Sequence, residues 1–509
     1  METILNKQLT VKQLSKVVPS PALSIPGENI IGLPEKVLQF GTGVLLRGLP
    51  DYFIDKANKQ GIFNGRIIVV KSTAKGSTDA FEKQDGLYTI SVKGIEDKQT
   101  VEENIINASI SRVLGASDEW SEVLQCAHDS QIELIISNTT EVGITLVEEN
   151  ISANPPSSFP AKLTAFLYER FKTFQGSKES GMVIIPTELI TDNGSKLKNI
   201  VLQLAAFNQL ETEFISWIQS SNHFCNSLVD RIVPGKLSAQ DQQATEEQLG
   251  YSDELMIMAE PFRLWAIESN SERVKEVLSF GKVDEGVVIA PDIEKFRELK
   301  LRLLNGTHSF SCAVAALAGF ETVKDAMKDA QLSSFVKQLM MEEIARSMND
   351  TLVTYDESVA FANKVMDRFS NPFLLHKWLS ISLNYTSKMK MRNVPLLTRY
   401  FEKFNKVPSC MALGFAAYIV FMNSHKGNDG AYHGEINGNT FVIEDEKAGF
   451  FAEQWALGNT DTIAKAVLSN TELWGTDLTQ LKGFTETVVQ NINTILAEGM
   501  VAALNKRSN

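Results

Sequence analysis

A glycine turn between a strand-like run and a helix-like run is the feature that most restricts the fold. The stretch VLQFGTGVLLRGLPDYFID, residues 37–55, places Gly41 and Gly43 directly after β-rich residues and before an amphipathic segment. Such a turn lets backbone N–H groups and a helix N-terminus approach a pyrophosphate. A full GxGxxG pattern is not met, because Leu46 stands at the third glycine's position and Gly48 comes two residues later. The turn predicts a dinucleotide site, with a purely structural turn as the alternative.

β-rich runs alternate with helical patterns in the residues that follow. KVLQF, GRIIVVK, LYTISV and IELIISN are rich in Val, Ile, Tyr and Phe, whereas SDEWSEVLQCAHD has the apolar spacing of a helix. SANPPSSFPAK then predicts a loop, KLTAFLYERFKTF a helix, GMVIIPT a further strand, and NGSKLKNIVLQLAAF a loop with a helix. This alternation predicts an α/β, doubly wound sheet.

The pattern changes near residue 292, where apolar residues recur at three- and four-residue spacings. DIEKFRELKLRLLN, FSCAVAALAGF and SVAFANKVMDRF are examples. We therefore predict two domains: residues 1–291 as a Rossmann-like dinucleotide-binding domain with extensions, and residues 292–509 as a mainly α-helical substrate-binding and catalytic domain. Small-molecule pockets concentrate at domain boundaries, so we expect the active cleft between the two.

Charge and cysteine usage narrow the class of partner. The 49 Lys and Arg against 62 Asp and Glu leave a net charge of −13, which argues against nucleic acid and against an anionic membrane. A small-molecule ligand is expected instead. The four cysteines, Cys126, Cys225, Cys312 and Cys410, form no CxxC or zinc-finger spacing, which predicts no structural metal and a reducing compartment. With no signal-peptide pattern and no long apolar window, the cytoplasm is the expected location.

The end of the second strand bears on the choice of cofactor. An acidic residue there would bind the adenosine ribose, but RIIVVK leads into Lys71, Ser72 and Thr73. A lysine and two hydroxyls suit a ribose phosphate, which favours NADP. The alternative is that Lys71 simply points into solvent.

A second candidate site lies in ELKLRLLNGTHSF, where Lys300, Asn305, Gly306 and His308 interrupt a Leu-rich helical segment. Asn and Gly cost about 0.5 to 1 kcal/mol each in a helix relative to Ala. Hydride transfer to a ketone needs a proton donor and a group that stabilises the developing alkoxide. Lys300 can be the acid/base if its surroundings lower its pKa, Asn305 can donate to the oxygen, and His308 can orient substrate or lysine.

Helical geometry leaves this assignment open. On an ideal α-helix Asn305 and His308 lie on adjacent faces, with Lys300 about 80° from His308 and two turns back. The alternatives are Lys300 as a solvated charge, Asn305–Gly306 as a helix stop, and His308 as a core or capping residue.

Eight segments together resemble a known family. QFGTGVLLRG, DGLYTI, TTEVG, PAKLTAFLYERF, NSLVDRIVP, EPFRLWAIE, KLRLLNGTHS and RFSNP occur in this order between residues 37 and 372. They resemble the zinc-independent, polyol-specific long-chain dehydrogenases, the mannitol dehydrogenase family. The resemblance implies that Lys300 is the acid/base, that Asn305 and His308 are its catalytic partners, and that the cofactor is NAD, with NADP as the alternative. The expected cofactor-binding residues are Val37, Leu38, Gln39, Phe40, Gly41, Thr42, Gly43, Val44, Leu45, Leu46, Arg47, Gly48 and Lys71.

One segment departs from the family pattern. A CDN…NG signature with an oxyanion asparagine is replaced by PTELITDNG, which has Glu188 and Leu189 at the Asp and Asn positions and keeps Asn193 and Gly194. PTELI resembles a branch that acts on hexuronate-derived keto acids, which implies interconversion of D-tagaturonate and D-altronate. The fructuronate/mannonate and mannitol/fructose pairs are alternatives within the family. A non-catalytic dinucleotide-binding sensor is an alternative of another class.

A uronate substrate carries a carboxylate, and the segment NPFLLHKWLSISLNYTSKMKMRNVP is rich in basic residues. Arg392 stands where mannitol-type members have a substrate-binding lysine, and arginine suits bidentate binding of a carboxylate. We expect Arg392 to bind the substrate, with His376 and Lys388 as further candidates. A solvated helix face is the alternative for these residues.

Two acidic residues match family positions that face the cleft, Glu141 in TTEVG and Asp230 in NSLVDR. Substrate binding is the expected role, and a helix cap or a structural ion pair is the alternative. The expected partner is a small sugar acid, without nucleic acid, membrane or metal, and the sequence leaves the oligomeric state undetermined.

Overall fold

The computed structural model describes residues 7–72, 77–139 and 143–507. The chain divides into two compact units: Met1–Lys93 with Thr100–Ile293, and Gly94–Gln99 with Glu294–Asn509.

The first unit contains most of the β-structure. Its strands are β1 (Leu23–Ser24), β2 (Glu35–Phe40), β3 (Arg66–Lys71), β4 (Tyr88–Glu96), β5 (Gln99–Asn107), β6 (Ile110–Gly115), β7 (Leu134–Ser137), β8 (Val183–Pro186), β9 (His223–Phe224), β10 (Ser227–Asp230), β11 (Ile257–Ala259), β12 (Leu264–Glu268) and β13 (Val287–Ala290). Its helices are α1 (Val11–Leu14), α2 (Val44–Gly48), α3 (Pro50–Lys59), α4 (Asp79–Lys83), α5 (Trp120–Gln125), α6 (Phe159–Thr173), α7 (Asn193–Phe207), α8 (Thr212–Ser221), α9 (Ala239–Leu249) and α10 (Glu272–Val277).

A parallel, six-stranded sheet organises the first unit, with strand order β6-β3-β2-β7-β8-β9. Numbered along the chain, this is the 3-2-1-4-5-6 order of a doubly wound dinucleotide-binding sheet. The prediction of a Rossmann-like fold is therefore confirmed. The order reverses between β2 and β7, and ligands of such sheets bind outside the carboxyl ends of the strands at that point.

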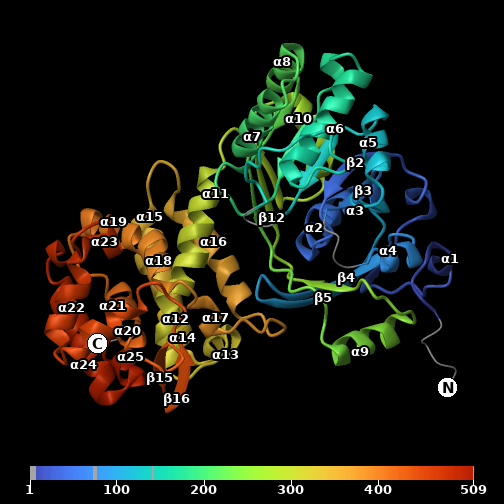
Figure 1. Ribbon diagram of the computed structural model, residues 1–509. Helices are drawn as coiled ribbons and strands as arrows, with labels where there is room; N and C mark the ends of the chain where they lie inside the picture. The colour runs from blue at the N-terminus through green and yellow to red at the C-terminus, as the bar shows by residue number, and fades with distance from the viewer. Residues whose placement is uncertain (1–6, 73–76, 140–142, 508–509) are drawn as a thin grey trace. The chain divides into compact units, whose positions relative to one another are not determined.

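Both faces of this sheet are buried, which explains the continuous apolar runs of its strands. Alternate residues enter different cores: Ile67 and Val69 of β3 pack with α3, whereas Ile68 and Val70 pack with α5 to α8. Figure 1 shows α5 to α8 gathered beside β2 and β3.

Two local predictions are wrong. The run LYTISV forms part of β4, which belongs to a separate sheet of order β1-β5-β4-β11. Only Asp97 and Lys98, both at positive φ, connect β4 to β5. A two-residue turn of this kind joins antiparallel neighbours, whereas a parallel sheet needs long crossovers. In NGSKLKNIVLQLAAF no loop precedes the helix, because α7 begins at Asn193.

The second unit is mostly helical, as predicted. Its helices are α11 (Glu294–Leu299), η6 (Lys300–Gly306), α12 (Thr307–Leu317), α13 (Val323–Lys328), α14 (Ala330–Gln338), η7 (Leu339–Ile344), α15 (Ala345–Met348), α16 (Tyr355–Phe369), α17 (Trp378–Ile381), α18 (Tyr385–Lys388), η8 (Met389–Asn393), α19 (Val394–Phe404), α20 (Ser409–Phe421), α21 (Ala448–Ala456), α22 (Thr460–Leu468), α23 (Thr471–Trp474), α24 (Phe484–Glu498) and α25 (Met500–Arg507). A small antiparallel sheet adds β14 (Ser424–Lys426), β15 (Tyr432–Ile436) and β16 (Asn439–Val442). In the described part of the chain, no helix has the length and apolar character needed to cross a bilayer.

The close packing of α7 against the end of β9 gives a stability prediction. A Cβ at Gly194 would lie 2.5 Å from the carbonyl carbon of Cys225, which is backbone and cannot move aside. Gly194→Ala should therefore lower the free energy of unfolding by about 1 to 3 kcal/mol, measured by urea denaturation.

Gly32→Ala is the matched control, since no atom lies within 4 Å of its added Cβ. It should leave stability unchanged or raise it by up to about 1 kcal/mol. Equal effects of the two substitutions would contradict the packing argument.

Candidate active site

A π-helical segment carries the predicted catalytic residues. The helix from Glu294 to Leu317 is continuous, and its middle part, Lys300–Gly306, is a π-helix. The prediction of α-helical angles is wrong here, because i→i+5 hydrogen bonding brings Lys300 and Asn305 one above the other. The helix-stop alternative for Asn305–Gly306 is also wrong, since α12 begins at the next residue. π-Helical turns are frequent at functional sites.

Gly306 permits a second π-helix, η8, to approach the first. A Cβ on Gly306 would lie 3.3 Å from Cδ1 of Leu396 and 3.8 Å from the backbone oxygen of Arg392. Asn393 Nδ2 donates to the Gly306 carbonyl at 3.1 Å. Glycine is therefore required at this position by the close packing of the two segments that carry candidate site residues.

A buried arginine joins the same two segments. Arg302 donates through Nη1 to the carbonyl oxygens of Met391, at 2.7 Å, and Arg392, at 3.0 Å. Its Nη2 lies 3.0 Å from Glu298 Oε1, and Arg399 Nη1 lies 2.9 Å from Glu298 Oε2. Burial alone would raise the pKa of Glu298, but the two guanidinium groups outweigh it and hold that pKa below its usual value.

His308 is buried, with 7% of its surface exposed, next to basic side chains. Its ring stacks on Phe369 with centroids 4.2 Å apart, and the His376 ring lies 5.1 Å away, nearly perpendicular. Burial, helped by the positive charges of His376, Arg368, Arg392 and Lys388, lowers the pKa of His308 well below its usual value. The imidazole is therefore neutral near pH 7, and its Nε2 has no hydrogen-bond partner among the described residues.

Three of the five predicted substrate residues, His376, Lys388 and Arg392, lie near this histidine. Arg392 Nη1 donates to Ser309 Oγ at 3.2 Å, and Ser309 Oγ donates to the Asn305 carbonyl at 3.0 Å. Lys388 Nζ donates to the Ile381 carbonyl at 2.8 Å. Burial lowers the pKa of Arg392 and also that of Lys388, on which the charge of Arg392 acts in the same direction. We call His308, Arg368, His376, Lys388 and Arg392 the basic cluster.

Sequence reasoning missed two members of this region. Arg368 is buried near the end of α16, and Ser309 is buried beside His308. Arg368 lies in the RFSNP motif, which could have drawn attention to it. Ser309 carried no signal, because its role depends on the approach of η8.

The glycine turn of the first unit has the geometry that a dinucleotide requires. Gly41 has φ +129°, and a Cβ there would lie 2.9 Å from the Asn138 carbonyl oxygen. Only glycine fits such a position. A Cβ at Gly43 would have no atom within 4 Å, so space is open beside the turn. The turn lies where the sheet order reverses, which fits NAD.

Other residues of the predicted cofactor segment face the interior. Val37, Leu38 and Phe40 are core residues of β2. Arg47 Nη1 donates to the Leu255 carbonyl at 2.6 Å, so this guanidinium anchors α2. These side chains support the turn.

Lys71 is half-buried at the end of β3. The hydroxyl of Ser72 next to it is buried and has no partner among the described residues. Thr73 lies outside the described residues.

The two acidic candidates have different outcomes. Glu141 lies outside the described residues. Asp230 is buried at the end of β10, opposite Leu264 of β12. The adjacent Arg231 donates to the Gly48 carbonyl at 2.6 Å and so ties the end of α2 to this sheet.

In the altered PTELITDNG segment, Asn193 lies in the interior. Asn193 Nδ2 donates to the carbonyl oxygens of Pro186 and Glu188, each at 3.0 Å, and its Oδ1 accepts from backbone N–H groups of Gly194 and Ser227. Asn193 is therefore a structural residue. Leu189 of the same segment is 62% exposed.

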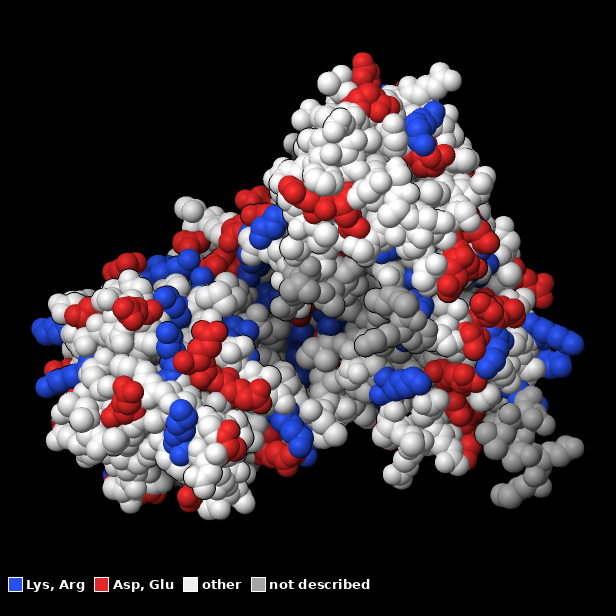
Figure 2. All heavy atoms as spheres, viewed as in Figure 1, with Lys and Arg blue, Asp and Glu red and all other residues white. Residues whose placement is uncertain are grey.

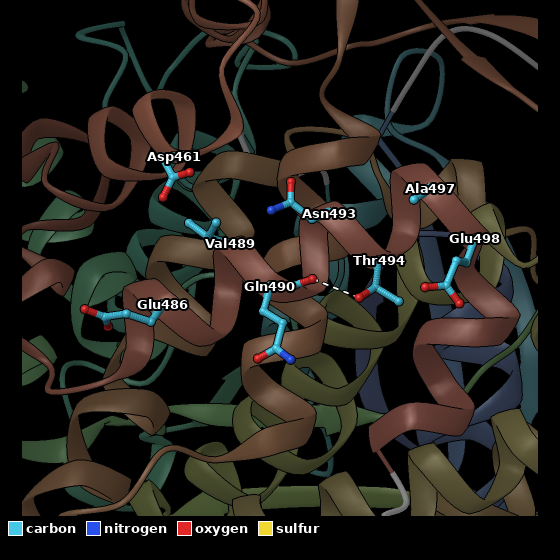
Figure 3. Close-up of a pocket in the computed structure, with 8 residues that line it drawn as sticks. All are labelled: Asp461, Glu486, Val489, Gln490, Asn493, Thr494, Ala497 and Glu498. Atoms are coloured by element: carbon cyan, nitrogen blue, oxygen red, sulfur yellow. Dashed lines mark hydrogen bonds between the residues drawn. The ribbon is translucent and has the colours of Figure 1, made fainter.

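A groove elsewhere in the helical unit contains none of the predicted residues. It lies along α22 and α24, has a volume of about 550 Å³, and is lined in part by Asp461, Glu486 and Glu498 (Figure 3). These carboxylates would repel an anionic sugar acid. On the face drawn in Figure 2, acidic and basic side chains are interspersed. Among the described residues, no three His, Cys, Asp or Glu side chains group closely enough to hold a metal.

Comparison with known proteins covers most of the chain. Residues 35–278 match the mannitol dehydrogenase Rossmann domain, and residues 292–496 match the mannitol dehydrogenase C-terminal domain. An altronate oxidoreductase of Halalkalibacterium halodurans is 38% identical over 93% of both chains. One from Bacillus subtilis is 37% identical over 92% of this chain and 95% of its own.

Two solved structures share the fold. Mannitol 2-dehydrogenase of Pseudomonas fluorescens, in a ternary complex with NAD and D-mannitol, has a TM-score of 0.69 at 20% identity over 98% of this chain and 99% of its own. A substrate-free D-sorbitol dehydrogenase has a TM-score of 0.78 at 21% identity over 98% of this chain and 100% of its own.

The buried Glu298 predicts a pH-dependent contribution to stability. Glu298→Gln removes the charge that pairs with Arg302 and should cost about 3 kcal/mol at pH 7, measured by chemical denaturation. Because the folded-state pKa lies below the ordinary 4.5, the contribution is complete above that pH. It is lost as the pH falls from about 4.5 through the folded-state pKa.

Glu272→Gln is the control, because the Glu272 side chain of the Lys275 pair is 79% exposed. It should change stability by less than about 1 kcal/mol at any pH. A Glu298→Gln loss that stayed constant down to pH 4 would contradict the ion-pair explanation.

Proposed function

The chain belongs to the mannitol dehydrogenase family, and we propose that it is an NAD-dependent oxidoreductase that interconverts D-tagaturonate and D-altronate. The observation that carries this proposal is the basic cluster, which lies around Ser309 and His308 next to the π-helix of Lys300 and Asn305. Several cations close to one neutral histidine are unfavourable without an anion. The substrate carboxylate supplies that anion.

The first unit holds the cofactor. The turn at Gly41 and Gly43 lets the backbone approach the pyrophosphate, and Lys71 and Ser72, at the end of β3, face the adenosine ribose. Bound NAD supplies the hydride chemistry. Binding of NADP would use Lys71 to contact the ribose phosphate. The ratio of the affinities for NAD and NADP therefore tests whether Lys71 makes that contact.

The second unit supplies the proton and the substrate contacts. Lys300 donates a proton to the carbonyl oxygen of tagaturonate during reduction and accepts it from altronate in the reverse direction. Asn305, one π-turn further on, donates a hydrogen bond that stabilises the negative charge developing on that oxygen. The neutral His308 holds the substrate through its Nε2, which has no hydrogen-bond partner in the described part of the chain.

Arg392 binds the carboxylate, because its guanidinium can donate two parallel hydrogen bonds. Lys388 adds positive charge, and His376, whose pKa burial lowers, adds a hydrogen-bond donor. The four cysteines are buried and free, and we propose the cytoplasm as the location.

Substrate preference tests the proposal most directly. NADH oxidation should be compared with tagaturonate, fructuronate and fructose at equal concentrations, with tagaturonate expected to give the highest kcat/KM. Fructose as the best substrate would overturn the uronate assignment, and NADH binding without turnover of any ketone would indicate a sensor.

Lys300→Ala tests the proton donor. It should lower kcat/KM for tagaturonate by about 10² to 10⁴-fold, the usual contribution of general acid/base catalysis, with little change in NADH affinity. Lys295→Ala is the control, because Lys295 lies on the same helix but pairs with Glu357 at 2.7 Å. Activity of Lys300→Ala within a few-fold of wild type across pH would rule out this role.

Arg392→Met tests the carboxylate site. Loss of a charged hydrogen bond should raise KM for tagaturonate by about 10 to 100-fold, measured by steady-state kinetics. Lys377→Met is the control, because Lys377 lies in the same segment with its side chain 58% exposed. A KM that stayed within twofold of wild type in both variants would place the carboxylate elsewhere.

A further inference from the structure

Glu188 occupies an unusual place in the first unit. It follows β8 at the carboxyl edge of the parallel sheet and is 3% exposed. A buried carboxylate must be compensated by hydrogen bonds or opposite charge. Among the described residues, the hydrogen-bond donors to this carboxylate come from the end of the neighbouring strand, β7.

The carboxylate binds the backbone and side chains that end β7. Its Oε1 accepts from both the backbone N–H and the hydroxyl of Thr139, each at 2.9 Å. Its Oε2 accepts from the hydroxyl of Ser137 at 3.1 Å. Glu188 thereby fixes the position of the segment that leaves β7.

That segment also contacts the glycine turn. The backbone N–H of Asn138 donates to the Phe40 carbonyl at 3.2 Å. The side-chain Nδ2 of Asn138 donates to the carbonyl and hydroxyl oxygens of Thr187, each at 3.0 Å. The Asn138 carbonyl would be 2.9 Å from a Cβ on Gly41. The ends of β2, β7 and β8 therefore form one connected edge, and Glu188 is its only carboxylate among the contacts described.

A doubly wound sheet binds one mononucleotide with each half. The adenosine half uses the ends of β2 and β3, so the ends of β7 and β8 face the nicotinamide half. We propose that Glu188 is a positioning residue for the nicotinamide ribose, holding Ser137 to Thr139 in the conformation that this ribose requires. This proposal rests on the proposed use of NAD. Glu188 acts through Thr139 and Asn138 rather than on the reacting atoms.

The experiment compares two ligands that share the adenosine half. NADH and AMP are titrated separately into the full-length wild type and Glu188→Ala, with binding followed by calorimetry. The variant should bind NADH about tenfold more weakly, as expected for lost hydrogen bonds to a charge, and bind AMP within about twofold of wild type. Glu188→Gln keeps an acceptor for Thr139 and should restore most of the NADH affinity.

Asp284→Ala is the control for a general loss of stability. Asp284 is also a buried carboxylate of the first unit, and it accepts from Lys56 at 2.7 Å, Arg263 at 2.8 Å and the Gly286 N–H at 2.8 Å, away from the edge formed by β2, β7 and β8. The Asp284→Ala variant should have a lower Tm than wild type but the same ratio of NADH to AMP affinity.

Equal weakening of NADH and AMP by Glu188→Ala, or no weakening of either, would overturn the positioning role. If Glu188→Ala does not fold, Glu188→Asp replaces it. The shorter side chain of Asp should weaken NADH binding selectively as well, but by a smaller factor. Failure of wild type to bind NADH would instead refute the proposed cofactor.

Discussion

The buried guanidinium of Arg302 is the interaction on which the candidate site depends. It is charged, so it must be paired, and Glu298 on the preceding helical turn supplies the pair. Its remaining donors bind the backbone of Met391 and Arg392. One buried charge therefore fixes the distance between the helix that carries Lys300 and the helix that carries Arg392. Gly306 permits this approach, and Ser309 connects the two helices a second time.

In the first unit, the glycine turn after β2 lets backbone atoms come close to a ligand. Side chains are kept away from the turn after β2, since Gly41 has no space for a Cβ. The neighbouring strand ends are held by side chains that point back into the protein, including Glu188 and Asn193. The acid/base chemistry that we propose, by contrast, rests on side chains of the second unit. The first unit therefore contributes mainly backbone groups to the proposed site, and the second unit contributes side chains.

Much of this arrangement could be predicted from the sequence. Continuous apolar strands with a glycine turn indicated a doubly wound sheet, and the spacing of Lys300, Asn305 and His308 indicated a candidate site. The π-helix could not be predicted, because Leu-rich residues favour an α-helix and π-helices are rare. The run LYTISV was correctly predicted as a strand but assigned to the wrong sheet, because the residues of a strand do not determine which strand it pairs with. Ser309 and Arg368 acquire their roles only through tertiary contacts.

The π-helix at Lys300–Gly306 also sets the rotational phase of the helix that follows it. A π-turn takes up one residue more than an α-turn, so α12 leaves this segment rotated relative to the axis that α11 would have imposed. If the same residues formed an α-helix without a π-turn, His308 would lie about 100° further round the helix axis. The direction of the His308 side chain therefore depends on the π-turn that precedes it.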